Sequence, residues 1–129
     1  MEERERWHEG LEARRAVLGD AYVDAALARR TPFTEAFQDL LTRHAWGEIW
    51  TRPGLERRVR SLVTVAMLVP LGQWDELKLH VRGALRNGVT RGELEEVLLQ
   101  AAVYCGLPAA NKAFHVAEEA FAAADAEEP

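Results

Sequence analysis

The sequence predicts an all-α protein, a single-domain bundle of six or seven helices. Three observations support this class. Apolar side chains recur at helical spacing, residues typical of helix caps and helix ends separate these stretches, and no hairpin signal joins two alternating runs. The chain has 129 residues, 48% of them hydrophobic and 29% charged, which fits one globular domain spanning residues 1–129.

Three helices are predicted in the first part of the chain, over residues 2–18, over residues 21–30, and from about residue 31 toward Trp46 or Trp50. The first is rich in helix-forming residues, with Gly10 as its weak point because glycine lowers helix propensity. The third begins with Thr31 and Pro32, which suit an N-cap and a first helical turn. Its apolar residues share one face: Phe33, Phe37, Leu40 and Leu41.

Four further helices are predicted over residues 55–69, 74–86, 90–105 and 109–124. Proline and glycine break the chain before and after the first of them. Asn87-Gly88 is a common left-handed helix stop, and Thr90 with Glu93 fits a capping box. Gly106 and Pro108 then end the third of these helices.

The composition disfavours several classes of protein. The formal net charge is −5, whereas a nucleic-acid binder usually carries a basic face. Cys105 is the single cysteine, so neither an intramolecular disulfide nor a multi-cysteine metal site can form. The charged N-terminus lacks the apolar segment of a secretory signal, and no apolar run is long enough to span a bilayer. We therefore expect a cytoplasmic protein with no nucleic-acid or membrane partner.

Residues 43–50 hold the first candidate functional group. His44 and Glu48 are four residues apart, and so are Trp46 and Trp50, so in a helix each pair shares a face. A carboxylate beside an imidazole can tune a proton donor, and tryptophan rings can wall a planar ligand. The same spacing also fits a surface ion pair beside buried rings, and spacing alone favours this structural interpretation.

Glu76 and His80 form a second pair at the same spacing, in which the carboxylate can orient an imidazole for acid–base chemistry. A solvated surface contact, worth roughly a few tenths of a kcal/mol, is the alternative and is favoured by spacing alone. In the preceding helix, Arg60 borders the apolar stripe, which suits a buried stem and a guanidinium that clamps a carboxylate. Arg57 and Arg58 fit a solvated basic face better.

Several stretches of the chain resemble the carboxymuconolactone decarboxylase family. The signature-like stretch is WGEIWTRPGL, from Trp46 to Leu55. Other similar stretches extend the resemblance over nearly the whole chain: residues 14–23, 60–62, 66–68, 79–82, 87–90, 98–106 and 108–111.

The resemblance implies an all-helical fold shared with alkylhydroperoxidase-D-like proteins, and a homo-oligomer that is commonly a hexamer. The peroxidase relatives use two cysteines followed by a histidine. Placing that histidine on His80 puts the cysteine positions at Gln73 and Glu76, so both thiols are absent here. This disfavours disulfide-based peroxide reduction and favours the decarboxylase branch.

The resemblance also implies decarboxylation of 4-carboxymuconolactone to the enol-lactone of β-ketoadipate and CO2, in the breakdown of protocatechuate. The substrate is a small lactone carboxylate whose own carbonyl accepts the electrons, so neither a cofactor nor a metal is expected. The alternatives within the same fold are an enzyme for another small lactone or acid, and a non-catalytic binding or assembly module.

Such a reaction needs a proton donor and cationic partners for the carboxylates and the developing oxyanion. We expect His80 to deliver the proton, oriented by Glu76. Arg60 and Arg52 are the expected carboxylate or oxyanion partners.

The group at residues 43–50 is expected to complete the site. We expect Glu48 to destabilise the departing carboxylate by like charge or to pair with His44. We expect the rings of Trp46 and Trp50 to exclude water from the substrate.

Overall fold

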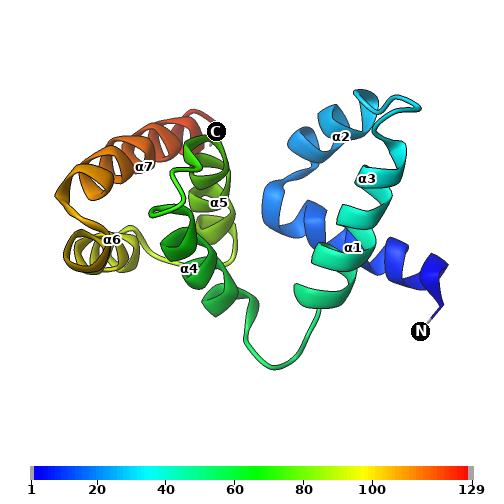
Figure 1. The fold of residues 1–129 in the computed structure, drawn as a ribbon, viewed down its shortest axis with the longest axis horizontal. Helices are drawn as coiled ribbons and strands as arrows, with labels where there is room; N and C mark the ends of the chain where they lie inside the picture. The colour runs from blue at the N-terminus through cyan, green and yellow to red at the C-terminus, as the bar shows by residue number, and fades with distance from the viewer. Residues whose placement is uncertain (1, 128–129) are drawn as a thin grey trace. The chain divides into compact units, whose positions relative to one another are not determined.

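The computed structural model describes residues 2–127, and all regular structure in that range is helical (Figure 1). Seven α-helices and one π-helical segment are present there, which confirms the predicted all-α class. The chain divides into two compact units at the boundary between Arg57 and Arg58. That residues 1–129 act as one domain stays a prediction. Within the described range, no helix combines the length and apolar character needed to cross a membrane.

The first unit is built by α1 (Glu3–Leu18), α2 (Asp20–Ala28), α3 (Glu35–Leu40) and the π-helical segment η1 (Leu41–Ile49). α1 packs on η1 at a crossing that contains two glycines. A Cβ atom on Gly10 would lie 2.0 Å from the carbonyl oxygen of Thr42, and one on Gly47 would lie 2.3 Å from that of Arg6. The glycine that weakens α1 as a helix is therefore required by the close approach of the two backbones.

The predicted start of the third helix is wrong, because α3 begins at Glu35 rather than at Thr31 and Pro32. The Thr31 amide donates to Thr34 Oγ1 at 3.0 Å, and the Thr34 amide donates to Thr31 Oγ1 at 3.3 Å. These side-chain bonds hold a separate turn ahead of the helix. Phe33 in this turn is 94% exposed, so the predicted apolar face does not begin in the core.

The second unit contains α5 (Trp74–Arg86), α6 (Arg91–Cys105), α7 (Leu107–Glu127) and all of α4 (Arg57–Leu68) except its first residue. Its core draws on all four helices, and α7 packs against both α5 and α6. The largest fully buried side chains of this core are Leu77, Leu94, Leu98, Val65, Val69 and Val81. The predicted boundaries agree within a few residues, although α4 begins at Arg57 instead of residue 55.

Local signals set the ends of these helices as predicted. Thr90 Oγ1 accepts from the amide of Glu93 at 3.1 Å, and the amide of Thr90 donates to Glu93 Oε1 at 2.9 Å, which confirms the capping box. Gly88 has φ 88°, which confirms the left-handed stop after α5. Gly106, with φ 99°, separates α6 from α7.

Candidate active site

His44 and Glu48 form a polar pair on η1. His44 Nδ1 lies 3.2 Å from Glu48 Oε2, and that oxygen is also 3.9 Å from an Arg6 guanidinium nitrogen. The His44 side chain is 63% exposed and that of Glu48 is 48% exposed. The prediction that the two share a face is confirmed, and the pair is accessible to solvent.

Trp46 and Trp50 stack on each other in the same segment. Their ring centroids are 5.0 Å apart with an interplanar angle of 21°. Trp46 is buried, Trp50 is half-buried, and Thr51 Oγ1 donates to the carbonyl of Gly47 between them at 2.8 Å. The prediction that the two rings share a face is therefore confirmed.

The backbone of η1, which carries His44, Trp46 and Glu48 and is capped by Trp50, is π-helical, and the sequence did not predict this. The amide of Trp50 donates to the carbonyl of Ala45, five residues earlier, at 3.1 Å. Segments of π-helix are rare and are found frequently at functional sites. Arg52 lies two residues after Trp50 and is exposed.

His80 lies on α5 in the second unit and is 8% exposed, with the fully buried residues Leu77 and Val81 as neighbours along the helix. Burial lowers the pKa of its imidazole from 6.5 to about 4. The charged form loses its hydration in such an environment, so the imidazole is neutral at neutral pH. Glu76, one turn earlier, is exposed, and burial rather than this carboxylate governs the imidazole.

Arg60 is half-buried on α4, in the same unit as His80. Thr64 Oγ1 donates to its carbonyl oxygen at 2.8 Å. Arg58 forms an ion pair with Glu93 at the start of α6, so it ties α4 to α6 and has a structural partner.

Sequence reasoning missed a partly buried hydrogen bond between two polar side chains of this unit. The Asn87 amide group donates to Ser61 Oγ at 2.9 Å, and Ser61 is fully buried. Ser61 follows Arg60 on α4, and Asn87 caps the helix that carries His80. The bond therefore fixes the helix of Arg60 against the end of the helix of His80. Because asparagine is common at helix ends, the sequence suggested only a capping role for Asn87 and not its hydrogen bond to Ser61.

The predicted site residues are divided between the two units. The first unit holds His44, Trp46, Glu48, Trp50 and Arg52, and the second holds Arg60, Glu76 and His80. In the part of the chain that the structure describes, no group of three or more His, Cys, Asp or Glu side chains is arranged to hold a metal ion.

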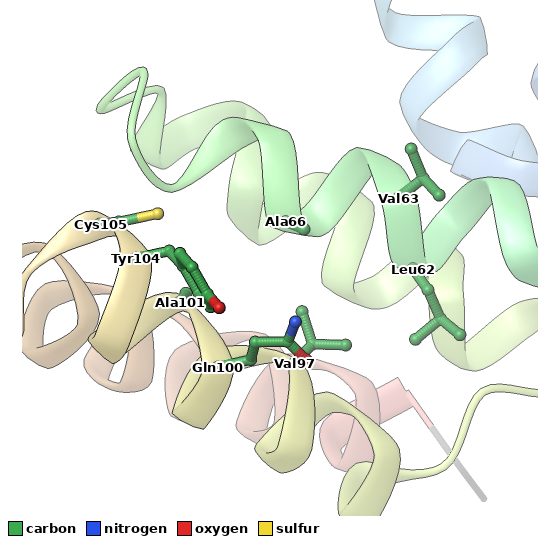
Figure 2. A pocket seen from close by; sticks show the side chains of 8 residues that line it. All are labelled: Leu62, Val63, Ala66, Val97, Gln100, Ala101, Tyr104 and Cys105. Atoms are coloured by element: carbon green, nitrogen blue, oxygen red, sulfur yellow. The ribbon is translucent and has the colours of Figure 1, made fainter.

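A separate apolar groove of about 360 Å³ lies between α4 and α6. Figure 2 shows side chains of both helices around this space. None of the predicted site residues lines it; its lining is Leu62, Val63, Ala66, Val97, Gln100, Ala101, Tyr104 and Cys105.

Comparison with known proteins gives matches across both units. The model of the carboxymuconolactone decarboxylase family matches residues 35–119. A 4-carboxymuconolactone decarboxylase of Acinetobacter baylyi is 49% identical over 121 residues, which cover 94% of this chain and 90% of that protein. A nitrosuccinic acid decarboxylase of Metarhizium robertsii is 49% identical over 111 residues, which cover 86% of this chain and 78% of that protein. An uncharacterised 15.0 kDa protein of Paracoccus denitrificans is 34% identical over 84 residues, 64% of this chain.

Proposed function

Because the chain belongs to the carboxymuconolactone decarboxylase family, we propose that it decarboxylates 4-carboxymuconolactone to the enol-lactone of β-ketoadipate and CO2. The observation that carries this proposal is the 49% identity, over 94% of the chain, to the Acinetobacter enzyme. The reaction belongs to the breakdown of protocatechuate. We further propose that the protein works in the cytoplasm as a homo-oligomer, a hexamer as is common in the family, and that residues 1–129 act as one catalytic domain.

The chemistry of the substrate explains why no cofactor is needed. Its departing carboxylate is attached to the ring carbon γ to the lactone carbonyl, across a C=C bond. When CO2 leaves, the electron pair moves through that double bond onto the carbonyl oxygen and forms a dienolate. A proton added at the α carbon then completes the product. The protein has to bind the remote acetate carboxylate, stabilise the developing oxyanion and deliver one proton.

His80 is the proposed proton donor, but its buried imidazole must first gain a proton. With a pKa of about 4, the imidazole of the free protein is almost entirely neutral near pH 7. A neutral imidazole can still donate a hydrogen bond to an oxyanion. A bound dianionic substrate would also raise the imidazole pKa, because a nearby negative charge favours the protonated form. We propose that His80 gains its proton in the substrate complex, with Glu76 as the orienting group.

The remaining roles are assigned by charge and position. Arg60 and Arg52 would bind the carboxylates or the developing oxyanion, since guanidinium groups match carboxylates in two hydrogen bonds. Glu48 would repel the departing carboxylate or act through its contact with His44. The stacked rings of Trp46 and Trp50 would keep water from the reacting carbon.

The direct test uses freshly generated 4-carboxymuconolactone, purified protein and a chelator, with CO2 release as the readout. Rapid release that depends on the protein is expected. A folded protein that released no CO2 would overturn the proposal and favour a differently specific enzyme or a non-catalytic module of the same fold.

Nitrosuccinate is a second candidate substrate, favoured by the 49% identity to the nitrosuccinic acid decarboxylase. The two compounds share a succinate skeleton in which the departing carboxylate and a carboxymethyl group are attached to the same carbon. In each, that carbon also carries an electron acceptor, the unsaturated lactone or the nitro group, and loss of CO2 leaves a dienolate or a nitronate. Measuring kcat/KM for both compounds ranks them. We expect the lactone to be preferred, and a higher value for nitrosuccinate would reverse the assignment.

A further inference from the structure

Arg6 of α1 lies directly against η1, at the glycine that precedes Glu48. A Cβ atom on Gly47 would lie 2.3 Å from the carbonyl oxygen of Arg6 and 2.9 Å from its Cγ atom. The backbone and the stem of Arg6 therefore cross Gly47 closely, and the Arg6 side chain is only 25% exposed. This close crossing limits the positions that the guanidinium can take.

The guanidinium of Arg6 approaches the same carboxylate oxygen that His44 contacts. Glu48 Oε2 lies 3.9 Å from an Arg6 guanidinium nitrogen and 3.2 Å from His44 Nδ1. Opposite charges attract at this distance. Arg6 therefore favours the orientation in which the Glu48 carboxylate faces both groups.

The contact between Arg6 and Glu48 is better suited to orienting a carboxylate than to stabilising the fold. It is too long for a hydrogen bond, and Glu48 is 48% exposed, so solvent screens the attraction. A shorter ion pair already joins the same two elements, because an Arg43 guanidinium nitrogen on η1 lies 2.6 Å from Glu3 Oε2 on α1. These two ion pairs provide a matched comparison at one crossing, with Glu48 involved in only one of them.

We propose that Arg6 is a positioning residue of the active site, which holds the Glu48 carboxylate toward His44 by its charge. This inference rests on the proposed decarboxylation, in which Glu48 repels the departing carboxylate or acts through His44. Both of these roles depend on where the carboxylate points, and a misplaced group at a reacting centre is costly in rate. Arg6 precedes the residues 35–119 that the family model matches, so α1 joins the elements that build the site.

The first test removes the charge of Arg6 and keeps an apolar stem against Gly47. Arg6→Met should lower kcat for 4-carboxymuconolactone about tenfold and change KM by less than about twofold, because Arg6 acts on the reacting geometry and not on substrate binding. Arg6→Lys should recover most of the loss, since the contact depends on charge and not on paired hydrogen bonds. Glu3→Gln is the matched control: it weakens the other ion pair of the crossing and should leave kcat unchanged.

The second test asks whether Arg6 acts through Glu48. In a Glu48→Gln background, Arg6→Met should change the residual kcat by less than about twofold, because the carboxylate that Arg6 orients is no longer present. A role in the fold, or a direct contact with the substrate, would instead leave the loss at about tenfold in that background. Urea denaturation of each variant shows that the proteins compared are folded.

The outcomes separate this inference from the proposed function. An active wild type would overturn the positioning role alone if Arg6→Met kept full kcat, if its loss persisted without the Glu48 carboxylate, or if the loss appeared as a rise in KM. A loss of kcat shared by Glu3→Gln would also overturn it, because the crossing and not Glu48 would then be responsible. A folded wild type that released no CO2 would overturn the proposed function and this inference with it.

Discussion

The two units contain the same sequence feature, a histidine and a glutamate four residues apart, in opposite environments. On η1, His44 is 63% exposed and lies 3.2 Å from Glu48. On α5, His80 is 8% exposed, and Glu76 faces solvent one turn away. Identical spacing therefore produced a solvated polar pair in one unit and a buried neutral imidazole in the other. The environment supplied by tertiary packing, rather than the spacing, decides what each histidine can do.

The sharpest test of this comparison exchanges each histidine for glutamine. His80→Gln should lower kcat for 4-carboxymuconolactone about 1,000-fold, since a buried proton or hydrogen-bond donor typically contributes that much. His44→Gln should lower it less than about tenfold, because a solvated side chain is more easily replaced by water. Steady-state kinetics at saturating substrate measures both. Equal losses in the two variants would show that burial does not separate the roles of the histidines.

The units also differ in what holds them together: an apolar core in the second and a glycine crossing in the first. Gly47→Ala should reduce the free energy of unfolding by at least about 3 kcal/mol, because its new Cβ atom would meet the backbone of Arg6, which cannot rotate away. Gly54→Ala is the matched control, since no atom lies within 4 Å of a Cβ atom at that position. Urea denaturation followed by circular dichroism measures both variants. A neutral result for Gly47→Ala would contradict the close crossing of α1 and η1.

Burial of His80 also predicts how stability depends on pH. The unfolded chain takes up the imidazole proton near pH 6.5, whereas the folded protein does so near pH 4. The unfolded state thus binds more protons between these values, so stability falls as pH drops from 6.5 toward 4 and is unaffected above that window. The expected loss from this group is about 2 to 3 kcal/mol at pH 4.5.

Urea unfolding at pH 7 and pH 4.5 measures this loss in the wild type and in two variants. His80→Gln should lack it, and His44→Gln should keep it. If His80→Gln lost as much stability as the wild type on acidification, carboxylates elsewhere would be responsible and the buried, neutral imidazole would be ruled out.

Sequence reasoning succeeded where the cause is local. The capping box of Thr90 and Glu93 and the stop at Gly88 depend only on neighbouring residues, and both are present as predicted. Sequence reasoning failed where contacts between residues far apart in the sequence determine the structure. The need for glycine at position 47 can be explained only by the close approach of the α1 backbone. The burial of His80 can be explained only by the helices packed around it. The π-helical turn of η1 likewise has no simple signal in its sequence.

The smallest predicted effect concerns the exposed pair itself. A double-mutant cycle of His44→Ala and Glu48→Ala should give a coupling energy of about 0.3 to 0.5 kcal/mol in unfolding experiments, as is usual for a helical pair in water. The coupling should shrink at high salt, because dissolved ions screen the attraction between exposed polar groups. A coupling above about 1.5 kcal/mol would mean that the pair is shielded from solvent in the working protein. The contrast between His44 and His80 would then hold for the isolated chain and not for its assembled form.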